Sequence, residues 1–304
     1  MNRSISIWFD AARPKTLPLA LVSILTGSSL AFSIGSFSPM VALLALVTAI
    51  LLQILSNLAN DYGDAVKGTD NEARIGPMRA LQSGAVTLKE MRQAIMINIT
   101  FTIFSGLALI FYALDSMQSI LAFICLGVLA MLAAIAYTVG NKPYGYVGLG
   151  DLSVFIFFGL LGVDGTYFLH TGVIDSHLLL PSIGCGLFAV AVLNVNNMRD
   201  IENDQECGKK TVAVRLGPEL AKKYHFSLLF GALVAFSGYL LLQGDAIWLM
   251  PFAISLIVVV KHAVAVKQAR CPVQIAPMLP VIVKCSVVTN LLFVSVLVAQ
   301  TIVS

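Results

Sequence analysis

Long apolar blocks alternate with short polar connections along almost the whole chain. Nine blocks are long enough to form helices, near residues 16–35, 40–60, 94–114, 118–138, 151–170, 178–197, 225–243, 246–266 and 281–302. About 20 apolar residues in a helix span the hydrocarbon core of a bilayer. The pattern therefore predicts an all-α, polytopic membrane protein with nine transmembrane helices.

Composition supports this prediction. Of the 304 residues, 58% are hydrophobic and 12% are charged, and the mean hydropathy is +0.88. A soluble domain carries about 25% charged residues. The first fifteen residues are mixed polar and basic, unlike a cleavable signal peptide. We expect one transmembrane domain over residues 1–304, with the lipid bilayer and no nucleic acid as a partner.

The five cysteines give no sign of a metal site or a disulfide framework. They are scattered, and none forms a CxxC pair: Cys125, Cys185, Cys207, Cys271 and Cys285. Scattered single cysteines are typical of reduced packing residues.

The positive charges are distributed very unevenly among the connections. All 19 Lys and Arg residues lie before the first span, after the second, fourth and sixth spans, or around the connection from the eighth to the ninth. The other connections hold Asp115, Asp175 and Asp245 with His170 and His177. Basic residues remain on the cytoplasmic side of a membrane. We therefore expect a cytoplasmic N-terminus, cytoplasmic long loops and an external C-terminus.

The loops after the second and sixth spans resemble each other. The first reads NLANDYGD over 57–64 and RIGP over 74–77, and the second reads NVNNMRDIEND over 194–204 and RLGP over 215–218. Such self-similarity predicts two pseudo-repeated four-helix units, followed by a ninth helix. In repeat-built membrane proteins the corresponding segments meet around a central site. We expect the two loops to face each other across a central cavity.

The polar residues of each loop share one helical face. They are Asn57, Asp61 and Asp64 in the first loop, and Asn197, Asp200 and Asp204 in the second. Facing carboxylates repel each other unless a cation lies between them, and Mg²⁺ binds through carboxylates together with substrate phosphates. Carboxylates at the end of an apolar helix therefore suggest a metal site for a lipid with a diphosphate head. Helix capping by Asp and Asn is the structural alternative.

At these residues the sequence resembles the UbiA superfamily of intramembrane aromatic prenyltransferases. The N-D-x-x-D motif of that family matches Asn60, Asp61 and Asp64, and its D-x-x-x-D motif matches Asp200 and Asp204. The segment RALQSGAVT at 79–87 is similar to the family's R-P-L-x-S-G-x-[VI], with alanine in place of proline. Further similarities run from RPKTLP at 13–18 through YTVGNKPYGY at 137–146 to TNLL at 289–292, so the resemblance covers nearly the whole chain.

Within that superfamily, the greatest similarity is to the branch that acts on 1,4-dihydroxy-2-naphthoate. The resemblance implies Mg²⁺-dependent transfer of a polyprenyl group from polyprenyl diphosphate to this acceptor, with loss of CO₂ and pyrophosphate. That reaction belongs to menaquinone biosynthesis at the bacterial cytoplasmic membrane. Another acceptor, such as 4-hydroxybenzoate or homogentisate, is an alternative. A secondary transporter is a second alternative, although transporters place their sites near the midplane on broken helices.

The resemblance also implies roles for individual residues. We expect Asp61, Asp64, Asp200 and Asp204 to be catalytic ligands of Mg²⁺, with neutral support from Asn57, Asn60 and Asn197. The candidates for binding phosphate oxygens are Lys67, Arg74, Arg79, Lys142, Lys209 and Arg215, some of which serve topology alone. The candidates for shielding an allylic cation are Tyr62, Tyr137, Tyr144 and Tyr146, for which an interfacial belt is the alternative. Arg13 or Lys15 is expected either to bind the acceptor's carboxylate or to anchor the first helix.

Overall fold

The computed structural model describes residues 3–72, 74–244 and 246–303, and within these ranges the chain is helical and contains no strand. The first half comprises α1 (Arg3–Ala11), α2 (Leu17–Ser33), α3 (Pro39–Lys67), α4 (Leu88–Ala113), α5 (Met117–Ala136), η1 (Tyr144–Val147), α6 (Gly150–Val154), η2 (Phe155–Gly165) and α7 (Thr166–Thr171). The second half comprises η3 (Ser176–Leu178), α8 (Leu179–Arg199), α9 (Ile201–Glu206), α10 (Val212–Gln243), η4 (Ala246–Trp248), α11 (Leu249–Gln268), α12 (Pro272–Ile275) and α13 (Met278–Val303).

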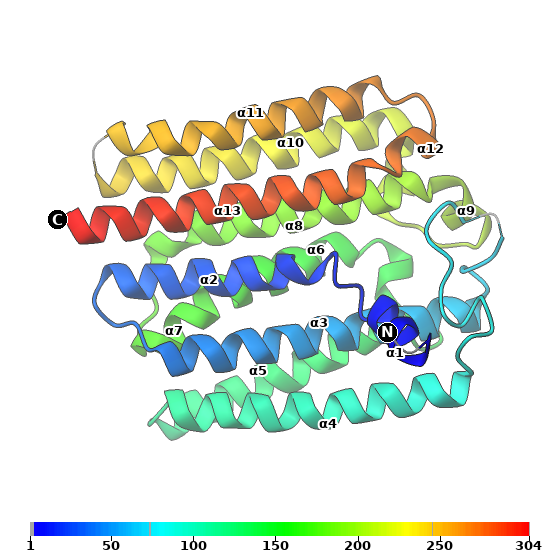
Figure 1. Ribbon diagram of the computed structural model, residues 1–304, viewed down its shortest axis with the longest axis horizontal. Helices are drawn as coiled ribbons and strands as arrows, with labels where there is room; N and C mark the ends of the chain where they lie inside the picture. Colours follow the sequence, from blue (N-terminus) through cyan, green and yellow to red (C-terminus); the bar gives the residue numbers. More distant parts are fainter. Residues whose placement is uncertain (1–2, 73, 245, 304) are drawn as a thin grey trace.

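The long helices lie side by side along a common direction (Figure 1). In the described part of the chain, 8 helical segments are long and apolar enough to cross a membrane. The shorter apolar helix α2 has 17 residues and brings the total close to the predicted nine. The prediction of an all-α, multi-pass membrane protein is confirmed.

Several helix ends differ from the limits of the apolar blocks. α3 continues to Lys67 rather than residue 60 and stops where Gly68 adopts a φ of 74°. α4 begins at Leu88 because Thr87 and Glu90 form a reciprocal capping box. α10 begins at Val212, well before the predicted residue 225, and bends at Gly217. An apolar block marks the hydrocarbon region, whereas caps and glycines decide where the helix ends.

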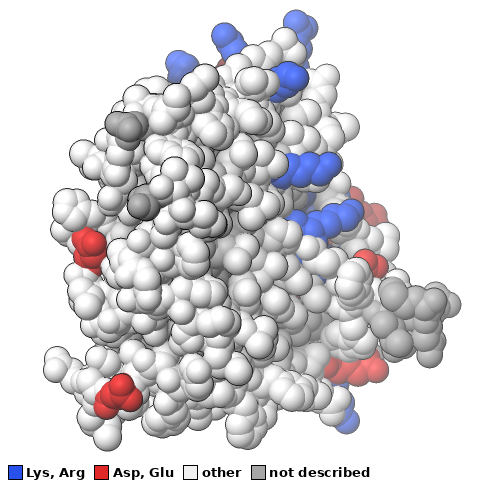
Figure 2. All heavy atoms as spheres, turned by 60° about the vertical axis from the view of Figure 1, so that its left-hand side comes forward, with Lys and Arg blue, Asp and Glu red and all other residues white. Residues whose placement is uncertain are grey.

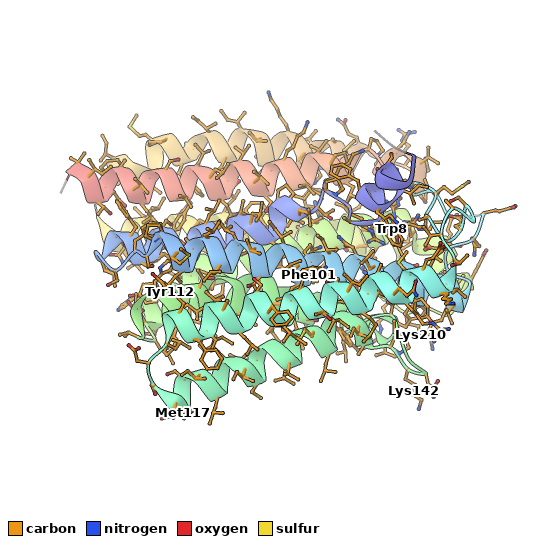
Figure 3. All side chains as sticks on the ribbon, turned by 60° about the horizontal axis from the view of Figure 1, so that its bottom comes forward. Trp8, Phe101, Tyr112, Met117, Lys142 and Lys210 are labelled. Atoms are coloured by element: carbon orange, nitrogen blue, oxygen red, sulfur yellow. The ribbon has the colours of Figure 1, made fainter. Side chains whose placement is uncertain are left out.

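The two ends of the bundle differ in charge. Lys142 and Lys210 lie at the same end as Trp8 of α1, whereas Tyr112 and Met117 lie at the opposite end (Figure 3). The C-terminus is at the end opposite to α9 and α12 (Figure 1). Figure 2 shows Lys and Arg along the upper and right-hand edges, while the side turned forward carries few charges. Asp245, which the sequence places in an external connection, lies outside the described residues.

The main hydrophobic core lies around α8, α10, α11 and α13. Phe236 on α10 is fully buried, and its ring centroid is 4.8 Å from that of Phe293 on α13. η2 is a π-helix over 11 residues, a form that is rare and is found mostly at functional sites. It packs closely on α8, where a Cβ atom at Gly159 would lie 2.6 Å from the carbonyl oxygen of Ser182. η2 is thereby held close against α8.

Candidate functional site

A cavity of about 390 Å³ lies between α2, α3, α4, α5, η2 and α8. Its apolar walls include Leu52, Leu109, Phe123, Phe157 and Leu161. Its charged and amide lining residues are Arg13, Gln53, Asn57, Asn60, Asp64, Asp70, Arg74, Arg79, Asn196, Asn197, Asp200, Asn203, Asp204 and Lys209. These polar groups come from the basic end of the bundle, so the cavity has a charged mouth and an apolar interior.

Asp61 lies behind this mouth and not on the lining. Its side chain is only 1% exposed, and it forms ion pairs with Arg13 and with Arg79, whose Nε is 3.5 Å from Oδ1. Arg13 adopts a φ of 53°, which is uncommon for a residue other than glycine. Asp61 therefore fastens the segment before α2 and the loop after α3 to the end of α3.

Asp64 lies on the cavity lining, and its main contact is a tyrosine. The hydroxyl of Tyr146 donates a hydrogen bond to Oδ1 of Asp64 at 2.8 Å and lies 2.5 Å from Oγ1 of Thr69. The Nζ atoms of Lys67 and Lys209 are 5.5 and 5.3 Å from the centroid of the Tyr146 ring. Tyr146 thus links the first acidic loop to a lysine of the second.

Asp200 is paired with its immediate neighbour in the chain. The Arg199 guanidinium donates from Nε to Oδ1 of Asp200 at 2.8 Å and from Nη2 to Oδ2, and Nη2 also donates to Asn196 Oδ1 at 3.0 Å. Asp200 separates α8 from α9, with φ and ψ of −103° and 13°. The second loop therefore turns sharply at its first carboxylate, whereas the first acidic residues stand on one continuous helix.

Asp204 and Lys209 form the other ion pair of the second loop, with Nζ 3.6 Å from Oδ1. Burial raises the pKa of Asp204 to about 6, although Lys209 acts in the opposite direction. Burial lowers the pKa of Lys209, but the nearby carboxylates of Asp64, Asp204 and Asp200 raise it overall. The mouth therefore combines a readily protonated carboxyl group with a firmly protonated lysine.

Two arginines of the loop after α3 complete the charged lining. Nε of Arg74 lies 3.1 Å from Oδ1 of Asp70, and Nη1 of Arg74 donates to the carbonyl of Pro77 at 2.8 Å. Burial and the neighbouring Arg13 lower the pKa of Arg79 to about 9, so this guanidinium remains charged at neutral pH. Both side chains reach the cavity.

The predicted amide residues also lie at the cavity. Asn57 donates to the carbonyl oxygen of Ala12 at 2.9 Å, and Asn60 accepts from the hydroxyl of Thr138 at 3.3 Å. Asn197 is buried on the lining. These contacts hold α3 against the segment before α2 and against the end of α5.

The aromatic wall of the mouth is built by Tyr137 and Tyr144. Their rings meet edge to face with centroids 5.3 Å apart. A Cβ atom at Gly150 would lie 2.8 Å from the hydroxyl oxygen of Tyr137, so only glycine permits this close approach. The ring of Tyr137 is therefore held firmly beside the cavity.

Three of the residues predicted to bind phosphate do not contribute to the lining. Lys67 is exposed and contacts the Tyr146 ring, and Lys142 is exposed at the basic end of the bundle (Figure 3). Arg215 donates to the carbonyl oxygen of Val147 at 2.6 Å and to that of Lys210 at 3.3 Å. Arg215 thus connects two loops outside the cavity.

Sequence patterns assigned no role to three residues that contact the site, namely Thr69, Arg199 and Asn203. They suggested the wrong contact for a fourth, Tyr146. Tyr146 was considered only as a cation shield, whereas its hydroxyl contacts a carboxylate. Asn203 donates to the carbonyl oxygen of Thr69 at 3.0 Å and so joins the two loops. Arg199 stands within the matched loop motif, and that position was the only signal for it.

Two isolated polar residues within the spans have structural partners. Asp164 on η2 accepts a hydrogen bond from the hydroxyl of Ser182 on α8. Asn290 on α13 accepts from the thiol of Cys185 at 2.9 Å and from the hydroxyl of Thr26 at 3.3 Å. These contacts join η2 to α8, and α2 to α8 and α13.

The donor atoms at the mouth suit a hard divalent cation. Asn203 Oδ1 and Asp70 Oδ2 are buried and have no hydrogen-bond partner among the described residues. Carboxylate and amide oxygens are the ligands of Mg²⁺, which protein usually holds by one or two carboxylates with phosphate completing the shell. In the described part of the chain, no three acidic, His or Cys side chains converge to enclose a metal. Metal binding here would therefore require phosphate oxygens as further ligands.

A multi-pass helical bundle with a charged mouth over an apolar cavity defines a membrane protein suited to an amphiphilic anion. The sequence profile of the UbiA prenyltransferase family matches residues 20–286. The chain belongs to this family of membrane prenyltransferases.

Individual relatives agree with this assignment. The chain is 50% identical over 287 residues to the 1,4-dihydroxy-2-naphthoate octaprenyltransferase of Escherichia coli (strain K12), covering 94% of this chain and 93% of the relative. It is 47% identical to the enzyme of the same name from Haemophilus influenzae, covering 96% of each chain.

Solved structures share the fold. The apo structure of a UbiA homolog from Aeropyrum pernix K1 has a TM-score of 0.64 at 16% identity and covers 99% of both chains. A UbiA homolog from Archaeoglobus fulgidus bound to GPP and Mg²⁺ has a TM-score of 0.60 at 16% identity, covering 92% of this chain and 98% of that one.

Proposed function

We propose that this protein transfers a polyprenyl group from polyprenyl diphosphate to 1,4-dihydroxy-2-naphthoate, with loss of CO₂ and pyrophosphate. The immediate product is demethylmenaquinol, the reduced form of demethylmenaquinone, an intermediate of menaquinone biosynthesis. The observation that carries the proposal is 50% identity, over nearly the whole chain, to a relative named for this acceptor. The cavity supports it, because a charged mouth and an apolar interior match a diphosphate head and a prenyl tail.

Mg²⁺ is the cation that this site would hold, through Asp64, Asp200 and Asp204. Archaeal structural relatives are described as bound to Mg²⁺ with DMAPP or GPP. When bound, the metal would neutralise charge on the departing pyrophosphate. Asp61 takes a different role in our proposal, because its partners are arginines: it positions Arg13 and Arg79 at the mouth.

The basic lining residues bind the diphosphate oxygens. Arg74, Arg79 and Lys209 reach the cavity beside the carboxylates and stabilise the negative charge that develops on the leaving group. The bond between the prenyl carbon and the diphosphate oxygen breaks, and the resulting allylic cation lies in the apolar cavity, where water is scarce. Tyr137 presents its ring to this cation at the cavity wall.

The acceptor ring supplies the electron pair for the new carbon–carbon bond. In 1,4-dihydroxy-2-naphthoate the prenyl group becomes attached to the ring carbon that carries the carboxylate. Loss of that carboxylate as CO₂ returns its bonding electron pair to the ring and restores aromaticity, so no base is needed to remove a ring proton. Arg13 lines the mouth and is placed to bind the acceptor's carboxylate.

The orientation in the bilayer is also part of the proposal. The basic end of the bundle, with the N-terminus and the mouth of the cavity, faces the cytoplasm, and the C-terminus faces outward. The support is the placement of all 19 Lys and Arg residues in connections on one side. In this orientation the prenyl donor enters the site from within the bacterial inner membrane. The soluble acceptor enters it from the cytoplasm.

Product analysis tests the activity. Purified protein is incubated with Mg²⁺, a polyprenyl diphosphate and 1,4-dihydroxy-2-naphthoate labelled in its carboxyl carbon. We expect labelled CO₂ and pyrophosphate in a one-to-one ratio, no turnover with EDTA, and little product from 4-hydroxybenzoate. A prenylated product that keeps its carboxyl group would refute the proposed acceptor, and it would leave the membrane fold and the diphosphate site in place.

A further inference from the structure

A second hollow lies on the outer surface of the bundle, between the basic ends of α10 and α11. It is lined by Glu219 and Lys222 of α10, by Val264, Lys267 and Gln268 of α11, and by Ala269 and Arg270 just after α11. We call this hollow the α10–α11 groove. It shares no residue with the cavity described above.

The α10–α11 groove carries a net positive charge. Lys222, Lys267 and Arg270 oppose the single carboxylate of Glu219, which lies 2.9 Å from the Nζ of Lys222 and is 81% exposed. Lys267 and Arg270 are exposed, and neither forms an ion pair with a carboxylate among the described residues. Figure 2 shows Lys and Arg side chains gathered along the upper edge of the molecule, where α10 and α11 lie in Figure 1. The groove therefore suits an anion.

An apolar surface continues from this groove towards the middle of the membrane. Val264 lines the groove, and Val260 and Ile257 precede it by one and two turns on the same face of α11. Their side chains are 47%, 48% and 58% exposed, respectively. Exposed aliphatic side chains on a membrane-spanning helix face lipid chains. Cations beside an apolar helical face are complementary to a phospholipid, which has a phosphate head group and acyl chains.

The positive-inside preference alone does not explain this arrangement. That preference requires basic residues at the cytoplasmic end, in any position around the bundle. Here cations from two helices and from the turn after α11 meet in one hollow, directly above lipid-facing valines. Basic pockets between transmembrane helices on the cytoplasmic side bind the head groups of anionic lipids.

We propose that the α10–α11 groove binds an anionic phospholipid, with its phosphate at Lys222, Lys267 and Arg270 and an acyl chain along Val264, Val260 and Ile257. The ligand is a lipid of the surrounding leaflet, because the groove is continuous with the exposed apolar face of α11 at Val264 and shares no residue with the reaction cavity. The bound lipid braces the ends of α10 and α11 and takes no part in the chemistry.

The test is lipid binding by the purified full-length protein in a mild detergent, with bound lipid counted by native mass spectrometry. The probes are phosphatidylglycerol and phosphatidylcholine with identical acyl chains. The variant Lys267→Gln/Arg270→Gln removes two groove cations, and Lys89→Gln/Lys210→Gln removes two exposed cations outside the groove as a matched control. Because the substituted residues are exposed, all proteins are expected to keep the same melting temperature without lipid.

The groove variant should bind phosphatidylglycerol about tenfold more weakly than the parent, since each cation near the membrane surface contributes appreciably to anionic lipid binding. The control should bind within about twofold of the parent, because its cations lie outside the groove. Excess inorganic phosphate should not displace the lipid, since phosphate lacks the acyl chains. Equal weakening in both variants, equal binding of phosphatidylcholine by the parent, or displacement by phosphate would overturn the proposal.

Discussion

The two acidic loops match in sequence but are stabilised in different ways. In the first loop, Asp61 is buried against Arg13 and Arg79, which come from separate parts of the chain. In the second loop, Asp200 pairs with the adjacent Arg199, and Asp204 pairs with Lys209 a few residues later. The ion pairs of Asp61 are therefore contacts with distant parts of the chain, whereas those of Asp200 and Asp204 are local.

This difference shows how a repeated motif can be used for two purposes. Of the four matched carboxylates, those that reach the cavity are Asp64 in the first loop and Asp200 with Asp204 in the second. Asp61, the remaining member, is occupied in holding the mouth together. Tyr146 then joins the loops through its hydrogen bond to Asp64 and the backbone bond from Lys210. The matched loops thus combine into one mouth.

The largest expected effect concerns the carboxylates on the lining. Asp64→Asn and Asp204→Asn should each reduce turnover about 10²–10³-fold, because each removes a charge that stabilises the transition state. The measurement is the rate of pyrophosphate release at saturating Mg²⁺. Similar rates in parent and variants would show that these carboxylates are structural, and the two-loop site would then be wrong.

Removing one ion pair from each loop tests how much each pair stabilises the fold. Arg199→Gln removes the partner of a buried carboxylate and should lower the free energy of unfolding by about 3 kcal/mol. Arg79→Gln should lower it less, because Arg13 still pairs with Asp61. Thermal unfolding in detergent measures both, with the exposed Lys142→Gln as control. Activity should show the reverse order, since Arg79 lines the mouth and Arg199 does not.

A smaller effect is expected from Tyr146→Phe, which keeps the ring beside Lys67 and Lys209 but removes the hydroxyl. A hydrogen bond to a charged group contributes about 1.5–3 kcal/mol. We therefore expect a rise of about tenfold in the Mg²⁺ concentration for half-maximal activity. Tyr112→Phe, at the opposite end of the bundle (Figure 3), serves as the control. An unchanged Mg²⁺ dependence would show that Asp64 needs no support from the tyrosine.

The smallest expected effect is a pH dependence that distinguishes the second loop. Burial raises the folded-state pKa of Asp204 to about 6 from an ordinary value of 3.8. Its stabilising contribution to the metal-free protein is therefore present below pH 4 and is lost as pH rises through 6. Unfolding measured between pH 4 and 7 should show this slope in the parent but a flatter profile in Asp204→Asn. An identical slope in both proteins would contradict the raised pKa.

Much of the fold follows directly from the sequence. Apolar blocks are sufficient for the all-α fold and, closely, for the number of spans, because the thickness of the bilayer sets the length of each apolar helix. Caps modify this picture: Thr87 and Thr211 begin α4 and α10 well before the apolar blocks do. α1 and α9 were not predicted, because they are short and lie outside the apolar blocks.

The candidate site was predictable only in part. Helical spacing brings Asp61 and Asp64 to the same end of α3, and the matching loop motifs predict that Asp200 and Asp204 lie near them. In the structure Asp64, Asp200 and Asp204 line one cavity. No periodicity connects Arg13 with Asp61 across 48 positions, so their ion pair depends on tertiary packing. The same is true of Tyr146, whose hydroxyl reaches Asp64 from 82 positions away.

The central claim is that the two loops form one diphosphate site, and a double-mutant cycle tests it most directly. Calorimetry would measure binding of a polyprenyl thiolodiphosphate with Mg²⁺ to the parent, to Asp64→Asn, to Asp204→Asn and to the double variant. Residues that share one bound group are strongly coupled, whereas independent sites are additive. We predict that the double variant binds no more weakly than the weaker single variant. Losses of binding free energy that add fully in the double variant would contradict a shared site.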